Sequence, residues 1–253
     1  MDAAPERPPT RPSEATMRRR AAAMRAATLR REFDAFARDG PTHDLRTPLL
    51  GACEDGAEDA ARVILELGAA VDERDEKGTT ALMTAAAWGH AGVCRLLLER
   101  GADVNARDDG GDTALHEAVR ADADEVVIAL CEWPGCDVDA KNKHGCAPLH
   151  VASHAGNGAM TKLLIRLGAC VNREMNGGYS ALHVAAANGS SSSLSALLEG
   201  GANIRHSASE SNLHRTASGT ALELAEANGQ REAAAMLRNA SDLEFQRSGL
   251  FRD

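Results

Sequence analysis

The sequence predicts an all-α fold built from a helical unit that repeats about every 33 residues. The phrase Thr80-Ala81-Leu82 has copies whose leucines stand at 49, 82, 115, 149, 182 and 222, with spacings of 33, 33, 34, 33 and 40 residues. A second phrase, Gly68-Ala69, recurs in register at glycines 101, 135, 168 and 201. Two separate phrases do not keep one period by chance, so the chain is a repeat array.

The composition agrees with thin layers of small helices. Only 3% of residues are aromatic, whereas 23 glycines indicate turns at regular intervals. The formal net charge of -9 argues against nucleic acid as a partner, because phosphate binding needs a basic face. No run of eighteen apolar residues occurs, so we expect no membrane span.

Each unit is predicted to contain two helices and a connecting hairpin. In the second unit Thr80 can cap the first helix, and Gly89 can end it in a left-handed turn. The second helix carries an apolar stripe over 93–97, and Gly101 ends that helix. Residues 103–105 then lead into the next hairpin.

These motifs resemble the ankyrin repeat over residues 43 to 238, about six repeats. Tetratricopeptide repeats fit worse, because they lack the hairpin phrase seen at 101–105. The resemblance implies L-shaped units with short β-hairpin fingers, stacked into a solenoid with a concave binding face. The expected organisation is a disordered arm at 1–12, a basic amphipathic helix at 13–40 acting as an N-terminal cap, the ankyrin-repeat domain at 41–240, and a C-terminal tail at 241–253.

Three departures from the repeat are expected to distort it. Asp122 replaces the helix-ending glycine, and the third repeat is one residue longer at 132–135. An insertion of seven residues lies within 206–215; it is polar and Ser-rich, so we expect a mobile loop there.

The N-terminal segment carries both apolar and basic residues. Leu29, Phe33 and Phe36 share one helical face and could cover the apolar end of the array as a lid. Residues 1–46 carry ten Arg against seven acids, a charge of +3, which leaves -12 for the rest of the chain. The basic segment could be an organelle-targeting segment, a docking arm or a solvated helix face.

The residues that could carry chemistry have simpler roles in the repeat. His116, His150 and His183 each follow the repeated leucine, so we expect their rings to hydrogen-bond backbone groups between repeats. The glycine pairs at 110–111 and 177–178 lie in fingers, and do not form a phosphate loop. We therefore expect no catalytic residues, no cofactor and no metal ion.

The six cysteines are expected to be free thiols in a reducing compartment. They include no C-x-x-C pair, and the N-terminus lacks the apolar stretch of a secretory signal. Cys53, Cys94 and Cys131 fall at helical positions that should be buried, whereas Cys136, Cys146 and Cys170 lie near turns.

The candidate binding residues stand at positions that the framework does not restrict. In ankyrin-like arrays these are the fingers and the ends of the first helices. Here they are Glu54, Asp55, Glu76, Lys77, Thr79, Trp88, Asp109, Asp112, Arg120, Lys143, His144, Cys146, His154, Asn176, Tyr179 and Asn188. Trp and Tyr often dominate binding energy, although Trp88 could instead pack against the neighbouring repeat.

The leading functional hypothesis is a non-catalytic scaffold, adaptor or assembly subunit that binds a protein partner through the concave face. The alternative is a regulatory or chaperone-like protein that masks a partner's surface. We expect a cytoplasmic protein that is monomeric alone or a subunit of a complex. A nuclear location and organelle import through the Arg-rich segment stay open.

Overall fold

The computed structural model of the protein describes residues 28, 30–31, 47–208 and 219–249, and the side chains of these up to residue 243. Thr28, Arg30 and Arg31 are helical. The rest of the arm and basic segment, including Phe33 and Phe36, lies outside the described residues, and so does most of the Ser-rich insertion. The lid and the mobile loop therefore stay predictions.

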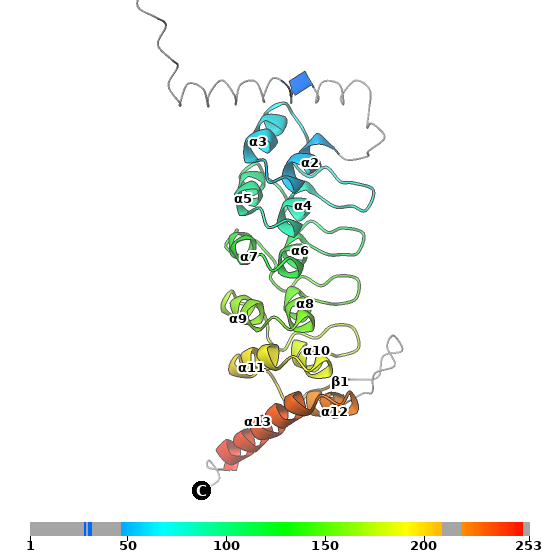
Figure 1. Ribbon diagram of the computed structural model, residues 1–253, viewed down its shortest axis with the longest axis vertical. Coiled ribbons are helices and arrows are strands. Elements are labelled where there is room, and N and C mark those ends of the chain that lie inside the picture. Colours follow the sequence, from blue (N-terminus) through cyan, green and yellow to red (C-terminus); the bar gives the residue numbers. More distant parts are fainter. Residues whose placement is uncertain (1–27, 29, 32–46, 209–218, 250–253) are drawn as a thin grey trace, which may run out of the picture.

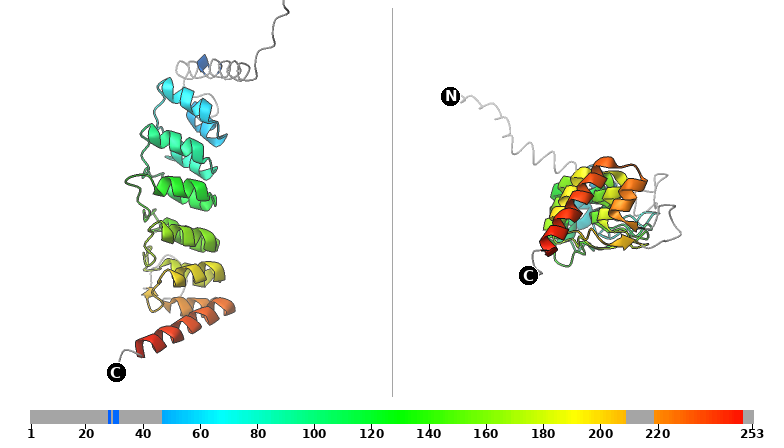
Figure 2. Two further views of the ribbon diagram at one scale, coloured as in Figure 1. Left: turned by 90° about the vertical axis from the view of Figure 1, so that its left-hand side faces the viewer. Right: turned by 90° about the horizontal axis from the view of Figure 1, so that it is seen from below.

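Twelve helices of the described residues form six antiparallel pairs, stacked one after another along a single axis (Figures 1 and 2). This arrangement confirms the all-α solenoid. The first helices of the pairs are α2 (Pro48–Glu54), α4 (Ala81–Ala87), α6 (Ala114–Arg120), α8 (Pro148–Ala155), α10 (Ala181–Asn188) and α12 (Ala221–Ala227). The second helices are α3 (Glu58–Glu66), α5 (Ala91–Glu99), α7 (Asp124–Cys131), α9 (Gly158–Arg166), α11 (Ser191–Glu199) and α13 (Arg231–Gly249). Helix α13 thus continues through much of the segment expected as a tail.

The first helices begin where the repeated phrase predicts. Thr47, Thr80 and Thr220 each accept a hydrogen bond at Oγ1 from the backbone N–H three residues later, at 3.3 Å in all three cases. These bonds satisfy donors that would otherwise have no partner in the first turn. The predicted caps are therefore confirmed at these positions.

The left-handed turns that end the first helices are also present. Gly89 has φ +77°, and Asp122 adopts the same region with φ +56°. A non-glycine residue there costs about 1–2 kcal/mol. The Asn157 side-chain amide donates to Asp122 Oδ1 at 2.5 Å, so the strained residue also links the third repeat to the fourth.

The core runs as one continuous layer between the two rows of helices. Five of the six repeated leucines are buried and Leu222 is partly buried, while alanines such as Ala85 and Ala86 are fully buried between neighbouring first helices. Because these side chains are small, helices of successive repeats approach closely along the array.

The fingers are hairpins with little strand character. The four fingers at 75–79, 108–112, 142–146 and 175–179 are each closed by two backbone hydrogen bonds, such as Asp108 N–H to Asp112 O at 3.0 Å and Gly111 N–H to Asp108 O at 2.9 Å. At their bases only isolated bridges occur, at Arg74–Thr80 and Glu174–Ser180. Two-residue strands pair antiparallel only at β1 (Ser207–Ala208) and β2 (Gly219–Thr220). The legs are too short for a ladder, so the expected β-hairpins are closer to turns.

Across the described residues, every helix is too short or too polar to cross a membrane.

Candidate functional site

The first helices and the fingers that precede them together form one side of the array, here called the finger face (Figure 1). This is the face that the sequence analysis expects to bind a partner. Most of the predicted residues are exposed there: Asp55, Glu76, Lys77, Trp88, Asp109, Arg120, Lys143, His144, His154, Asn176 and Asn188. Glu54, Thr79, Asp112, Cys146 and Tyr179 are partly buried.

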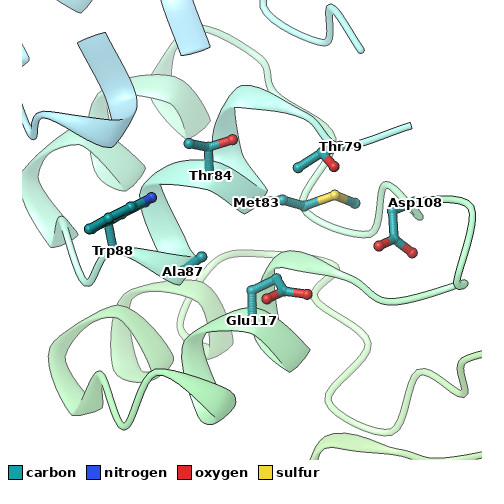
Figure 3. Close-up of a pocket in the computed structure, with 7 residues that line it drawn as sticks. All are labelled: Thr79, Met83, Thr84, Ala87, Trp88, Asp108 and Glu117. Carbon is teal, nitrogen blue, oxygen red and sulfur yellow. The ribbon is translucent and has the colours of Figure 1, made fainter. Parts of the chain in front are cut away.

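A cavity of about 240 Å³ lies on this face between the second and third repeats (Figure 3). Helix α4 supplies three of its lining residues, and the residues just before and just after that helix supply two more. The finger that follows α5 and helix α6 supply one each. The lining residues are Thr79, Met83, Thr84, Ala87, Trp88, Asp108 and Glu117. We call this cavity the Trp88 pocket.

Trp88 forms the apolar wall of the pocket. It stands at the C-terminal end of α4, and 59% of its surface is exposed. Met83 is buried beneath, at the position where three other repeats carry histidine. The repeat at this point therefore has an apolar floor and an uncovered indole, a combination that is costly to leave in water.

Carboxylates form the opposite side of the pocket. Oxygen atoms of Asp108, Asp112 and Glu117 lie within 4.8 Å of one another. Arg120 donates to Asp112 Oδ2 at 2.8 Å and to Glu117 Oε1 at 2.5 Å, and Asn142 donates to Asp112 Oδ1 at 2.8 Å. The cluster is thus an ion-pair network in which one guanidinium faces three acids.

The environment of Asp112 favours its charged form. Burial alone would raise the pKa of this carboxyl, but the hydrogen bonds from Asn142 and Arg120 outweigh burial and lower the pKa below its usual value. A finger position suggests an exposed acid, but only 16% of the Asp112 side chain is exposed and both of its oxygens are bonded.

Two other predicted residues are engaged with their neighbours. The ring of Tyr179 meets His183 edge-on, with centroids 6.0 Å apart, so this tyrosine is partly a packing residue. Asn188 reaches across to the preceding repeat, and its amide donates to the His154 carbonyl at 3.1 Å. These contacts tie both residues of the finger face to their neighbours.

Sequence reasoning missed three of the residues that give the pocket its character. Asp108 stands at the start of its finger, and its Oδ1 accepts hydrogen bonds from the backbone N–H groups of Gly110 and Asp112. Because this role in the turn accounts for the residue, nothing in the sequence suggested that its second carboxylate oxygen belongs to a site. Glu117 follows the His position, where the other units carry Gly51, Thr84, Val151, Val184 and Leu224. This variation marks an unrestricted position and could have identified Glu117. Met83 was visible only as a departure from the histidine pattern.

The histidines act as links in the framework. Thr113 N–H donates to His116 Nδ1 at 3.2 Å, so Nε2 carries the ring proton and donates to the Cys146 carbonyl at 3.0 Å. His183 makes the same pair of bonds, and its Nε2 reaches the His206 carbonyl at 3.1 Å. The predicted links between repeats are present for these two residues.

His150 departs from that pattern. Its Nδ1 accepts from Ala147 N–H at 3.1 Å, but its buried Nε2 meets no acceptor in hydrogen-bonding geometry among the described residues. Burial lowers the pKa of His150 to about 4, so the ring is neutral at pH 7. The expected link to the next repeat is therefore incomplete here.

The cysteines differ in their surroundings. Cys53 and Cys94 are buried as expected, and burial raises the pKa of each to about 12. Cys131 is only partly buried, contrary to expectation. Its thiol interacts with that of Cys136, and this interaction raises the pKa of Cys131 and lowers that of Cys136. All six cysteines are free thiols.

Comparison with known proteins gives consistent matches. The family model described as "Ankyrin repeats (3 copies)" matches residues 25–108, 49–142 and 115–208. The human protein "Ankyrin repeat domain-containing protein 63" is 35% identical over 162 residues, covering 60% of this chain and 33% of that protein. Human "Neurogenic locus notch homolog protein 2" is 36% identical over 154 residues, or 59% of this chain and 6% of that protein. Rat "Neurogenic locus notch homolog protein 1" is 34% identical over 202 residues, or 73% of this chain and 8% of that protein. The chain thus spans a third or less of the length of these relatives.

Proposed function

Because the chain belongs to the ankyrin-repeat family, whose repeats are protein–protein interaction modules, we propose that it is a non-catalytic adaptor or assembly subunit. It binds its partner protein through the finger face. The exposure of Trp88 carries this proposal, because a large indole is left in water beside a cavity on that face.

The extent of the finger face supports the same proposal. A standard interface buries about 800 Å² on each partner, which four or five adjacent repeats can supply. The exposed fingertips alternate in charge, with Lys77 beside Glu76 and Lys143 one finger beyond Asp109. A partner that follows the fingers therefore meets polar groups of both signs around an aromatic anchor.

The proposal predicts that Trp88→Ala weakens partner binding by about 2 kcal/mol, the value typical of an aromatic hot spot. The unfolding midpoint should barely change, because the indole is mostly exposed. Leu243→Ala is the matched control, since Leu243 is 58% exposed but lies on α13, away from the finger face. Affinity and stability are measured on the same preparations of each variant.

Crosslinking locates the contact independently. A photoreactive residue placed at Ala87, which is exposed on α4, should capture the partner, whereas the same residue at Ala159, exposed on α9, should not. If both positions capture the partner equally, and if substitutions of Trp88 and Tyr179 leave the affinity for the partner unchanged, another surface binds the partner.

A further inference from the structure

We propose that the Trp88 pocket recognises one arginine side chain of the partner's docking segment. This inference rests on the proposed function and adds the chemistry of the ligand. The cavity of about 240 Å³ is smaller than the roughly 300–1,000 Å³ of pockets that enclose drug-sized ligands. Its size thus suits one long side chain.

The two sides of the pocket match the two parts of an arginine side chain. Trp88, Ala87 and Met83 form apolar surface along α4, and Asp108 and Glu117 face it from the next finger and helix (Figure 3). An arginine has an apolar stem that can lie along such a surface. Its planar guanidinium can stack on an indole and donate to carboxylates in the same pose.

The negative charge of the pocket is only partly neutralised by the cation that the structure pairs with it. Arg120 is the cation paired with the cluster, and it bonds Asp112 Oδ2 and Glu117 Oε1. Asp108 Oδ2 and Glu117 Oε2 accept no hydrogen bond from any residue that the structure describes. Two carboxylate oxygens therefore remain for an incoming donor.

The nearby basic residues of the fingers are directed elsewhere. Arg74 donates to the Arg107 carbonyl at 2.6 Å, and Arg107 donates to the Lys141 carbonyl. These guanidinium groups run along the backbone of successive fingers and stabilise their stacking. Since these two arginines are used in this way, and Arg120 is the cation that the described residues pair with the cluster, the open oxygens can take a further cation from the partner.

The geometry favours arginine over lysine and over an apolar residue. A methionine or leucine would bury the open oxygens without giving them donors, which is unfavourable. A lysine ammonium is a strongly hydrated point charge, whereas the guanidinium is weakly hydrated and presents its donors in a plane that can stack on Trp88.

The direct test uses acetyl-arginine methylamide as the probe and the indole N–H signals in NMR spectra of the whole protein as the readout. The chain has two tryptophans, so Trp133, which is partly buried near the end of α7, serves as an internal control. We expect the Trp88 signal to move in a saturable manner while the Trp133 signal stays fixed. The citrulline analogue, which has the same shape without the charge, should bind roughly tenfold more weakly or not at all.

Two variants test the carboxylates. Glu117→Gln and Asp108→Asn should each weaken the response to the arginine probe several-fold. The second change keeps an Oδ1 acceptor, as Asn142 does in the next finger, so the turn is retained. Glu99→Gln, which removes an exposed acid from the second helix α5, should leave the response unchanged.

The outcomes separate this inference from the proposed function. Equal responses to the arginine and citrulline probes, or no response at all, overturn the arginine assignment. If partner binding still depends on Trp88 in that case, the finger face remains the binding surface. If instead the probe binds with arginine preference while Trp88→Ala leaves partner binding intact, the pocket chemistry holds and the proposed function fails.

Discussion

Single histidines show how one side chain links two repeats. In His116 and His183 one ring nitrogen accepts from the start of its own helix, and the other donates to a carbonyl of the following finger. This arrangement requires a neutral ring with the proton on Nε2. Burial lowers the pKa of both residues, so the neutral form persists as the pH falls below the usual histidine value.

His150 predicts a dependence of stability on pH. Its pKa is about 4 in the folded protein, against 6.5 for an unperturbed histidine. Between these values the unfolded chain binds more protons than the folded one, so the free energy of unfolding rises with pH through this window. This residue alone should remove about 2 kcal/mol on going from pH 7.5 to pH 5.

Urea unfolding of the wild type and of His150→Gln at both pH values measures this contribution. The variant should lose part of the pH dependence, while the contributions of His116 and His183 remain. Identical pH dependence in the two proteins would show that folding does not change the pKa of His150.

At the scale of elements, the fingers stack because glycine leaves room for the next finger. Asp109 N–H donates to the Lys77 carbonyl at 2.9 Å, and Lys143 N–H donates to the Gly110 carbonyl at 3.0 Å. A side chain at Gly145 would place Cβ 2.5 Å from the backbone nitrogen of Asn176. The fingers are therefore spaced by backbone contacts that no larger residue permits.

Two glycine variants separate this stacking from backbone strain. Gly101 has φ +91° and open space around it, so Gly101→Ala should cost about 1–2 kcal/mol of stability from conformation alone. Gly145, with φ +78°, carries the same kind of strain and a clash with Asn176 as well. Gly145→Ala should therefore cost about 1–3 kcal/mol more. Thermal or urea unfolding of both variants checks the difference, and equal losses would mean that the fingers move apart freely.

At the scale of the whole molecule, each repeat contacts only its neighbours, so the ends of the array need cover. Helix α13 supplies that cover at the C-terminal end, where it lies across the last repeats (Figure 2). Ala233, Ala234 and Leu237 are buried against the array. Leu243, further along the helix, is mostly exposed, so the covering part of α13 ends before it.

Truncation after Gln230 should therefore loosen the array from its C-terminal end. Burying a leucine alone contributes about 1.5–3 kcal/mol, so amide exchange in α12 should accelerate by an order of magnitude or more. Exchange in α4 should change much less, because it is several repeats away. A truncation after Asp242 keeps the buried residues and serves as the control. Uniform acceleration in all helices would instead indicate one cooperative unit.

The sequence by itself determined the period, the order of the helices and, at the threonine caps and glycine turns, where the first helices begin and end. These properties depend on local requirements that are visible residue by residue: a threonine that caps a helix, a glycine with positive φ that ends it, and a leucine that recurs on the inner side of the first helix. For the same reason Asp122 could be predicted in a strained turn from its position alone. The finger face could also be placed, because its positions vary while the framework recurs.

Only the tertiary structure decided which residues of that face act together. The Trp88 pocket joins α4 to the next finger and α6, and its volume depends on how two repeats stack. Likewise, Asp112 is tied to Arg120 and Asn142, and Tyr179 contacts His183, although the sequence presents them as free finger residues. Repetition determines where a side chain leaves the backbone. Its exposure and charge partners depend on the side chains that the neighbouring repeats bring beside it.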